Sequence, residues 1–533
     1  MEERFTVAGL LRTHASARPD APMLTLHGNT VSWATHYQRA CTLANALAAE
    51  GVGPGERVAF LDRSGMAYFE VLFGGALAGA VNVAVNWRLA PAEMAAIIDD
   101  AAARVLVVHA DYVPALAQMA SGLPAVRRIV VIGDPRVATG GGGASDAARR
   151  VGYEDWLADR PATDPGHRGT PEEVSMQLYT SGTTGLPKGV MLTNANLSTA
   201  IGGASTTFGI DESTVSLIAM PLFHIGGSGW ALCGMSRGGH SVILRDMDPA
   251  ELLRLVARHG VTETFVVPAV LMFVLATDAI ATTDLSSLRT VFYGASPIAE
   301  DVLVRCLDVF RCGFAQVYGM TETTGAITLL RPEDHDPDGP RRHLLRSAGR
   351  PLPDVELRII DPSSGAQLPP GKVGEVVTRS AYNMAGYWRK PEDTARTVEP
   401  DGWLHTGDAG YLDEEGYLFL HDRIKDMIVS GGENVYPAEV ENVLLSLAGV
   451  ADAAVIGVPH DTWGETVKAI VVRAPGAELD AATVMTFCRL RLAHFKCPTS
   501  VDFVEALPRN PSGKILKREL REPYWQGQGR RIS

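Results

Sequence analysis

One segment of the chain combines glycine, hydroxyl and basic residues in an order suited to binding phosphate. It reads Tyr179-Thr-Ser-Gly-Thr-Thr-Gly-Leu-Pro-Lys-Gly-Val190. Glycines let a loop turn its backbone N–H groups inward and leave room for an anion, while the hydroxyls add donors and Lys188 adds a positive charge. The order differs from the Walker pattern, in which Lys and then Ser or Thr directly follow Gly. The segment predicts a phosphate-binding loop between ordered elements, with an ordinary surface loop as the alternative.

A second group of polar residues lies in Gln316-Val-Tyr-Gly-Met-Thr-Glu322. A tyrosine at the end of a strand can offer a flat face to a purine, and Thr321 can offer a hydroxyl to phosphate. Glu322 can supply an oxygen ligand to Mg²⁺. The alternative for Thr321 and Glu322 is an ordinary exposed helix cap.

Other candidate residues have plain structural interpretations when taken singly. Asp408 can stabilise a turn, the charged residues of 422–426 are typical of a solvated turn, and Lys514 follows Ser-Gly as in many exposed loops. His224 lies in the apolar segment 221–227, where a lone histidine is more often a packed core residue than a catalytic one. The turn at 292–297 is explained by its Gly and its Ser-Pro pair.

Taken together and in this order, these segments resemble the signature motifs of the adenylate-forming enzymes: acyl-CoA synthetases, peptide-synthetase adenylation domains and luciferases. The resemblance extends over most of the chain, ending in the motif around Lys514. Peptide-synthetase domains usually carry Asp directly after the Phe of the segment around residue 224, to hold an α-ammonium group, whereas this chain has His224 there. The resemblance therefore implies an ATP-dependent acyl-CoA synthetase and disfavours an amino-acid substrate.

The resemblance also assigns roles to individual residues. The implied catalytic residues are His224, Thr321, Glu322 and Lys514, with Glu322 also the metal ligand. The implied ATP-binding residues are Thr180, Ser181, Gly182, Thr183, Thr184, Gly185, Lys188, Gly294, Ala295, Ser296, Gln316, Val317, Tyr318, Gly319, Thr321, Asp408, Arg423 and Lys514. The implied acyl pocket is lined by His224, Gly227, Gly229, Gly294, Gly319, Met320 and Gly325. Lys425 would be the hinge, and Ser430, Gly431 and Gly432 would line the path of coenzyme A.

The elements that must position these residues follow an α/β pattern. Continuous apolar runs at 58–61, 105–108 and 129–132 are typical of strands inside a sheet covered on both faces, and they alternate with helical patterns such as 36–50 and 66–80. The resemblance implies a large N-terminal domain, residues 1–424, of stacked mixed β-sheets flanked by helices with a small β subdomain. It implies a small mobile α+β lid, residues 425–533.

Composition limits the remaining choices. The 533 residues are 46% hydrophobic, which suffices for a sizeable core, and the net charge of −13 argues against nucleic acid as the main partner. The six cysteines show no metal-ligand spacing and are expected to be buried thiols of a cytoplasmic protein. The uncharged stretch 213–236 contains Pro221, His224 and several glycines, so we expect buried chain rather than a membrane span.

The expected reaction is ATP-dependent activation of a hydrophobic carboxylic acid as acyl-AMP, followed by transfer to coenzyme A, with ATP, Mg²⁺ and coenzyme A as cofactors. An acyl-AMP ligase that loads a carrier-protein thiol would share every ATP-binding residue, so it stays an alternative. A catalytically dead acyl-nucleotide sensor and a luciferase-like oxygenase are further alternatives. The sequence leaves open which acid is used, whether fatty, aromatic or polycyclic, and leaves the oligomeric state open, a homodimer included.

Overall fold

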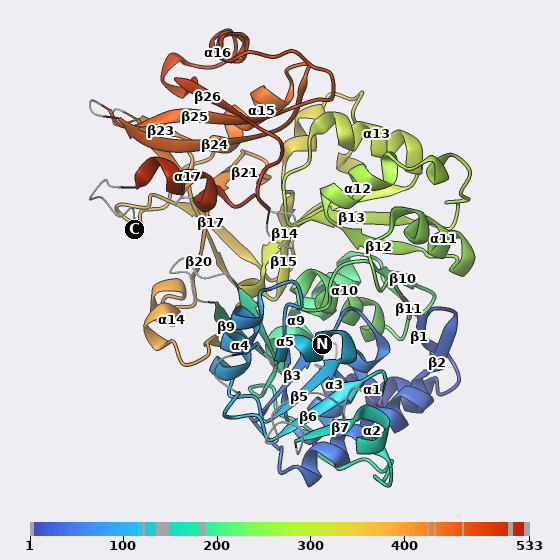
Figure 1. Cartoon of the computed structure of the whole chain (residues 1–533). Helices are drawn as coiled ribbons and strands as arrows, with labels where there is room; N and C mark the ends of the chain where they lie inside the picture. Colours follow the sequence, from blue (N-terminus) through green and yellow to red (C-terminus); the bar gives the residue numbers. More distant parts are fainter. Residues whose placement is uncertain are drawn as a thin grey trace.

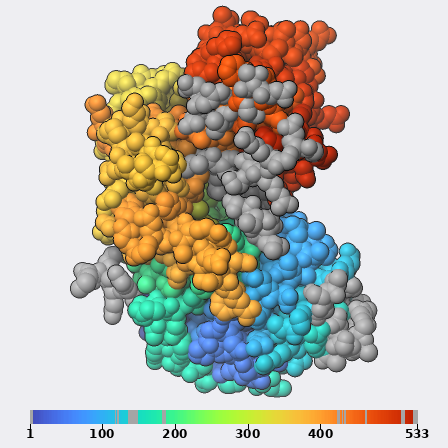
Figure 2. All heavy atoms as spheres, turned by 90° about the vertical axis from the view of Figure 1, so that its left-hand side faces the viewer, coloured from blue at the N-terminus to red at the C-terminus, as the bar shows by residue number. Residues whose placement is uncertain are grey.

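A computed structural model describes residues 5–116, 118–119, 123–134, 149–180, 187–423, 426–430, 433–460, 463–509 and 515–526. These residues form a large N-terminal domain of several sheets and a smaller C-terminal domain, as the sequence predicted (Figure 1). In Figure 2 the red C-terminal domain lies at one end of the molecule, beside the yellow-to-orange part of the chain and away from the blue N-terminal part.

The first sheet of the large domain carries the predicted phosphate loop at one side. Its strand order is β19-β9-β8-β4-β3-β5-β6-β7. The strands are β3 (Arg57–Leu61), β4 (Val81–Ala84), β5 (Val105–His109), β6 (Arg128–Ile132), β7 (Arg150–Gly152), β8 (Val174–Thr180), β9 (Lys188–Thr193) and β19 (Gly386–Tyr387). From β8 to β7 the neighbouring strands run parallel, whereas β9 is antiparallel to both β8 and β19. Every residue of β3 is buried, as expected for a strand covered on both faces.

The second sheet carries the predicted adenine and acyl segments. Its strand order is β16-β15-β14-β13-β12-β10-β11-β1-β2. The strands are β1 (Pro22–Leu26), β2 (Asn29–Ser32), β10 (Val215–Ile218), β11 (His240–Ile243), β12 (Glu263–Val266), β13 (Thr290–Gly294), β14 (Gly313–Met320), β15 (Gly325–Leu330) and β16 (Arg350–Pro351). From β11 to β14 the neighbouring strands are parallel, and β15 turns back antiparallel to β14.

Helices pack on these two sheets and join them in one hydrophobic core. The α-helices in the described part of the large domain are α1 (Val7–Ala17), α2 (Trp33–Ala49), α3 (Met66–Ala78), α4 (Pro91–Asp100), α5 (Val113–Leu116), α8 (Tyr153–Leu157), α9 (Asn194–Thr207), α10 (Ile225–Ser236), α11 (Pro249–His259), α12 (Pro268–Leu275), α13 (Glu300–Phe310) and α14 (Pro391–Thr397). The shared core includes Phe69 of α3, Leu197 of α9 and Leu232 of α10, together with strand residues of both sheets such as Met176 and Leu217.

Helix ends differ from the predicted ends by a few residues, for local reasons. α2 begins at Trp33 because the Ser32 hydroxyl accepts a hydrogen bond from the Thr35 N–H, which caps the helix. α3 ends at Ala78 because Gly79 has φ of 78°, a left-handed conformation that glycine adopts without strain.

A small antiparallel sheet and the C-terminal domain complete the described chain. The small sheet has the order β17-β18-β20-β21, with β17 (Glu356–Ile360), β18 (Gly374–Arg379), β20 (Leu404–Leu412) and β21 (Leu418–Arg423). The C-terminal domain pairs β22 (Ile428–Ser430), β23 (Glu433–Val435), β24 (Val450–His460), β25 (Gly464–Arg473) and β26 (Ser500–Val504), with helices α15 (Pro437–Leu445), α16 (Ala481–Arg489) and α17 (Lys517–Trp525). Its buried residues form clusters of their own.

The uncharged stretch and the cysteines belong to the folded part of the chain. No helix of the described residues is long and apolar enough to cross a membrane, and the uncharged stretch 213–236 forms β10, a connection and α10. The cysteines are buried thiols except Cys312, which is half-buried. Groups of three or more His, Cys, Asp or Glu side chains that could hold a metal ion do not occur within the described ranges.

Candidate active site

The predicted phosphate loop joins two paired strands of the first sheet. Thr180 at the end of β8 lies opposite Lys188 at the start of β9 in the antiparallel register. Ser181, Gly182, Thr183, Thr184 and Gly185 lie outside the described residues. The Lys188 ammonium group pairs with the Asp393 carboxylate at 3.1 Å and lies 5.1 Å from the centre of the Tyr387 ring. The hairpin therefore carries a half-buried cation at the start of β9.

Glu322 lies against this hairpin, although 142 residues separate it from Thr180. It belongs to a single 3-10 turn, Thr321–Thr323, directly after β14, and only 5% of it is exposed. Its Oε1 accepts hydrogen bonds from the Thr180 hydroxyl at 3.3 Å and from the Tyr387 phenol at 2.9 Å. A buried carboxylate in this position contradicts the alternative of an exposed helix cap for Glu322. Thr321 is half-buried.

A second hydrogen bond between distant segments joins β14 to the small sheet. The Tyr318 phenol donates to the Asp408 Oδ2 atom at 2.8 Å, across 90 residues of sequence. The Asp408 N–H donates to the Thr406 hydroxyl at 3.1 Å, which fixes the main chain beside it. In the β20–β21 register Asp408 lies opposite Arg423, whose backbone is described but whose side chain is not. The predicted adenine and ribose residues are thus neighbours in the fold.

A cluster of charged side chains contacts the chain just before Asp408. Glu375 of β18 accepts from the Gly407 N–H at 3.1 Å and lies 3.0 Å from His405 Nδ1, while Glu399 lies 2.8 Å from His405 Nε2. Hydrogen bonding to Glu375, and then to Glu399, raises the pKa of His405 to about 9. His405 is therefore an imidazolium at neutral pH, and it compensates the two carboxylates.

The turn at 294–296 lies next to the same strand. Gly294 pairs with Val317 in the β13–β14 register, and an added Cβ at Gly294 would lie 2.1 Å from the Val317 carbonyl oxygen. Ala295 has φ of 66°, which turns the chain sharply before Ser296. Gln316 accepts a hydrogen bond from the Tyr293 phenol at 3.3 Å. These residues form one edge of the region around Tyr318.

His224 is the residue directly before α10, and its side chain makes no capping hydrogen bond. Its ring lies 4.3 Å from the ring of Phe223, and its Nε2 atom is buried with no hydrogen-bond partner among the described residues. Burial, together with the nearby Arg88 charge, lowers the pKa of His224 to about 4. The imidazole is neutral at physiological pH, with the Phe223 ring in contact with it and the Arg88 charge nearby.

The glycines predicted to line the acyl pocket divide into two groups. Gly227 and Gly319 make close backbone contacts: an added Cβ would lie 2.2 Å from the Pro221 carbonyl oxygen and 1.9 Å from the Gly325 carbonyl oxygen, respectively. At Gly229 and Gly325 an added Cβ would instead meet side-chain atoms of Ile225, at 3.2 Å and 3.7 Å. Only the second group leaves space beside a movable side chain.

Trp230 and Phe265, which belong to none of the sequence motifs, pack with Phe292 of the 292–297 segment. The Trp230 ring lies 6.2 Å from the Phe265 ring and 5.2 Å from the Phe292 ring, and an added Cβ at Gly226 would meet Phe265 at 3.0 Å. Asp393 and Tyr387, which contact Lys188 and Glu322, were also missed, because they occur in a segment with no recognisable spacing of polar residues.

The predicted residues of the C-terminal domain are described only in part. Lys425, Gly431, Gly432 and Lys514 lie outside the described residues. Ser430 ends β22, and its main chain pairs with Glu433 and Gly464. On either side of the segment that contains Lys514, Arg509 and Ile515 form an antiparallel bridge.

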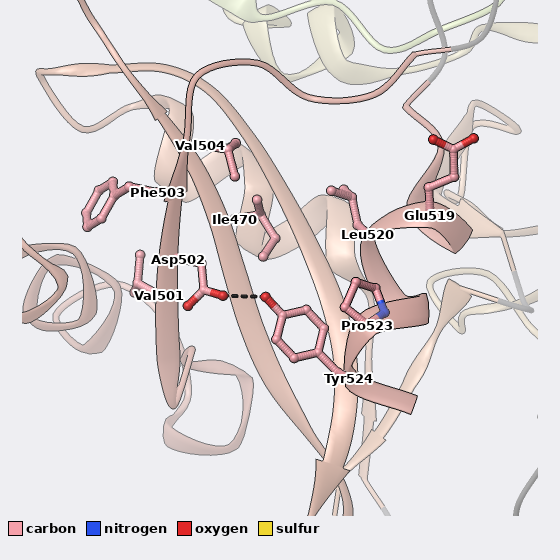
Figure 3. A pocket seen from close by; sticks show the side chains of 9 residues that line it. All are labelled: Ile470, Val501, Asp502, Phe503, Val504, Glu519, Leu520, Pro523 and Tyr524. Atoms are coloured by element: carbon pink, nitrogen blue, oxygen red, sulfur yellow. Dashed lines mark hydrogen bonds between the residues drawn. The ribbon is translucent and has the colours of Figure 1, made fainter. Parts of the chain in front are cut away.

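A pocket of the C-terminal domain lies between β26 and α17 and contains none of the predicted site residues (Figure 3). Its Asp502 carboxylate accepts from the Tyr524 phenol and pairs with Lys468 at 2.8 Å, so its charge is compensated. We assign this pocket no part in the site.

Two side-chain contacts, Thr180 with Glu322 and Tyr318 with Asp408, bring together the segments predicted to bind phosphate, adenine and ribose in a two-domain α/β protein. A protein-family model described as "AMP-binding enzyme" matches residues 11–388, and one described as "AMP-binding enzyme C-terminal domain" matches residues 439–514. The chain belongs to the AMP-binding enzyme family and is an adenylate-forming acid–thiol ligase. This confirms the family, the fold class and the class of enzyme that the sequence motifs predicted.

Proteins similar to this chain can be aligned with almost its whole length. A fatty acid–[acyl-carrier-protein] ligase, ScoC of Streptomyces coeruleorubidus, is 41% identical over 526 residues, which are 98% of this chain and 96% of ScoC. A feruloyl-CoA synthase of an Amycolatopsis species is 38% identical over 514 residues, 96% of this chain and 97% of that protein. The crystal structure of ATP-bound MatB from Rhodopseudomonas palustris superposes with a TM-score of 0.86 at 30% identity, covering 97% of this chain and 99% of MatB.

Proposed function

We propose that the chain activates a hydrophobic carboxylic acid with ATP and transfers the acyl group to coenzyme A. The observation that carries this proposal is the contact of the Thr180 hydroxyl, at the start of the phosphate loop, with the buried carboxylate of Glu322. This contact supports a metal-binding carboxylate beside the proposed position of the ATP phosphates. The Tyr318–Asp408 pair supplies the adenine and ribose end of the same nucleotide.

The residues present fit a Mg²⁺ ion bound together with ATP. Mg²⁺ is usually held by one or two carboxylates plus substrate phosphates, with water completing the shell. Glu322 supplies one such carboxylate beside the phosphate loop, and a protein cage of three or more ligands is absent from the described ranges. Bound there, Mg²⁺ would neutralise phosphate charge. Glu322 is thus the proposed metal ligand, with Thr321 next to it on the phosphates.

The first half-reaction makes the acid reactive. Carboxylates are poor electrophiles at neutral pH, so an oxygen of the acid attacks the α-phosphorus of ATP, and the bond to the β-phosphate oxygen breaks. Acyl-AMP forms and pyrophosphate leaves. Lys514 is the proposed cation that bridges the carboxylate and the α-phosphate, where negative charge concentrates in the transition state. The hydroxyls and backbone of 180–185 bind the phosphates, and Asp408 and Arg423 bind the ribose.

The apolar surroundings of His224 support a hydrophobic acid. The neutral imidazole beside Phe223 and the aromatic rings of Trp230, Phe265 and Phe292 close to α10 favour an apolar acyl group, although the Arg88 charge lies near His224. The proposed acyl pocket therefore lies along α10 and beside the strand ends at Gly294, Met320 and Gly325.

In the second half-reaction the C-terminal domain is proposed to turn a different one of its surfaces toward the active site. We assign residues 1–424 to the N-terminal domain and 425–533 to a lid that turns about Lys425. Turning would withdraw Lys514 and bring Ser430, Gly431 and Gly432 to the path of the pantetheine arm. The thiolate of coenzyme A then attacks the acyl carbonyl, the bond to AMP breaks, and the thioester forms. Hinges of this kind are a few residues that absorb large backbone changes.

A carrier-protein thiol is the second candidate acceptor. The observation that favours it is the 41% identity to a protein named as a fatty acid–[acyl-carrier-protein] ligase. The test is to supply acid, ATP and Mg²⁺ with either coenzyme A or a phosphopantetheinylated carrier protein and to measure AMP release and thioester formation. Thioester formation with coenzyme A alone supports the proposal, and formation only with the carrier protein replaces it by the second candidate. Absence of pyrophosphate release with every acid of a fatty, aromatic and polycyclic panel would favour the nucleotide sensor.

A further inference from the structure

We propose that Tyr387 is a positioning residue for Glu322: its phenol holds one carboxylate oxygen and leaves the other available to the metal–nucleotide complex. The inference rests on the proposed role of Glu322 as the metal ligand. Tyr387 is absent from every motif that the sequence analysis used.

The contact is direct and shielded from water. The Tyr387 hydroxyl lies 2.9 Å from Glu322 Oε1, and 8% of Tyr387 and 5% of Glu322 are exposed. A phenol is protonated at neutral pH and donates one hydrogen bond. An ionised carboxylate accepts such a bond more strongly than a neutral acceptor does. A buried carboxylate needs such partners, because an unsatisfied charge away from water is costly.

Both described donors converge on the same oxygen. The Thr180 hydroxyl also donates to Glu322 Oε1, at 3.3 Å, and it comes from β8, two strands away from β19 in the same sheet. Within the described residues, no hydrogen-bond donor reaches Glu322 Oε2. Two donors on one oxygen fix the plane of the carboxylate and leave the second oxygen for another ligand. Groups in this position orient the residues that bind a metal directly and tune their basicity.

The main chain around Tyr387 is tied to both halves of the site. β19 pairs with β9, so Tyr387 lies opposite Val190 of the phosphate hairpin, and the Trp388 N–H donates to the Gly189 carbonyl at 2.8 Å. Three residues earlier, the Met384 N–H donates to the Glu322 carbonyl, also at 2.8 Å. These backbone hydrogen bonds hold the main chains of the two segments at a fixed separation, so the Tyr387 hydroxyl and the Glu322 carboxylate start from fixed main-chain positions.

The Tyr387 ring has a separate contact that a test must preserve. Lys188 Nζ lies 5.1 Å from the ring centre and pairs with Asp393. Tyr387→Phe removes the hydroxyl and keeps the ring, so it changes the partner of Glu322 without removing the aromatic surface beside Lys188. Tyr382→Phe is the matched control: its buried hydroxyl donates to the Pro353 carbonyl at 3.1 Å and has no contact with Glu322.

The experiment measures metal binding without turnover. Mn²⁺ is titrated into each variant saturated with an α,β-methylene analogue of ATP, and free Mn²⁺ is followed by electron paramagnetic resonance. Removing an outer partner of a metal ligand typically weakens metal affinity by about tenfold to a hundredfold. We expect this loss in Tyr387→Phe and a change below about twofold in Tyr382→Phe. In a Glu322→Gln background, Tyr387→Phe should add nothing, because the two residues act as one unit.

Each outcome decides the inference. Mn²⁺ affinity within twofold of wild type in folded Tyr387→Phe overturns it, and so does an equal loss with and without the Glu322 carboxylate. If Glu322→Gln itself binds Mn²⁺ normally, the proposed metal role fails and this inference fails with it. Loss in Glu322→Gln but not in Tyr387→Phe overturns the inference alone. Should Tyr387→Phe not fold, Thr180→Val removes the other donor to the same oxygen, and unchanged Mn²⁺ affinity in that variant is the overturning result.

Discussion

Gly227 and Gly229 lie two residues apart on α10, and their environments predict opposite responses to the same substitution. At Gly227 an added Cβ would lie 2.2 Å from the Pro221 carbonyl oxygen and 2.6 Å from the Met220 carbonyl oxygen. At Gly229 it would lie 3.2 Å from Ile225 Cδ1, the end of a side chain that can rotate. Sequence alone treats both as small residues that make room for the acyl group.

The expected change in the free energy of unfolding follows from these contacts. Overpacking against fixed atoms costs about 1–3 kcal/mol, and an overlap with two backbone oxygens belongs at the upper end of that range. Replacing glycine by alanine within a helix returns about 1 kcal/mol. Gly227→Ala should therefore destabilise the large domain by about 2 kcal/mol. Gly229→Ala should leave stability within about 1 kcal/mol of wild type, since the Ile225 methyl group can move.

The assay is urea denaturation of both variants, followed by a test of turnover on an acid panel. Gly229→Ala should keep the denaturation midpoint and change the ranking of acids by chain bulk, whereas Gly227→Ala should lower the midpoint. Equal midpoints for Gly227→Ala and wild type would refute the reasoning from backbone contacts. A Gly229→Ala enzyme that turns over every acid as before would remove Gly229 from the acyl pocket.

Further predictions concern pH and the two half-reactions. Because the pKa of His405 is raised in the folded protein, the stability that its charge contributes is complete below its unfolded pKa of about 6.5 and is lost as pH rises through about 9. Over that pH range the melting temperature of wild type should fall more than that of His405→Gln. Parallel curves of melting temperature against pH would contradict the charge pairing of His405 with Glu375 and Glu399. Lys514→Ala should lower acyl-AMP formation by roughly two or three orders of magnitude and spare thioester formation from supplied acyl-AMP. Lys425→Pro should do the reverse, because proline restricts the backbone needed for turning; equal slowing of both steps by both variants would contradict a two-orientation lid.

The sequence predicted elements well where one local signal dominated. The apolar run at 58–61 became the fully buried β3. On either side of the hydroxyl- and glycine-rich segment, Thr180 and Lys188 pair across antiparallel strands. The end of α3 was missed by two residues, since it depends on Gly79 adopting a left-handed conformation rather than on apolar periodicity.

The site was predicted less completely because its contacts join distant parts of the chain. Tyr387 and Glu322 are 65 residues apart, and nothing in the residues around Tyr387 indicates that its hydroxyl meets a carboxylate. Glycine is ambiguous for a different reason. The same residue type serves close backbone packing at Gly227 and space beside a side chain at Gly229, and only the position of neighbouring atoms separates the two.

The proposed mechanism requires that acyl-AMP forms where the phosphate hairpin meets Glu322. The most direct measurement is isotope exchange between pyrophosphate and ATP without any thiol acceptor, for wild type and Glu322→Gln, over the acid panel. The glutamine amide oxygen can still accept from Tyr387 and Thr180, so the variant should fold. We predict exchange that requires an added hydrophobic acid in wild type and falls by at least about a hundredfold in folded Glu322→Gln, as for loss of a major electrostatic contact in a transition state. Exchange that needs no acid, or that persists undiminished in Glu322→Gln, would contradict the account.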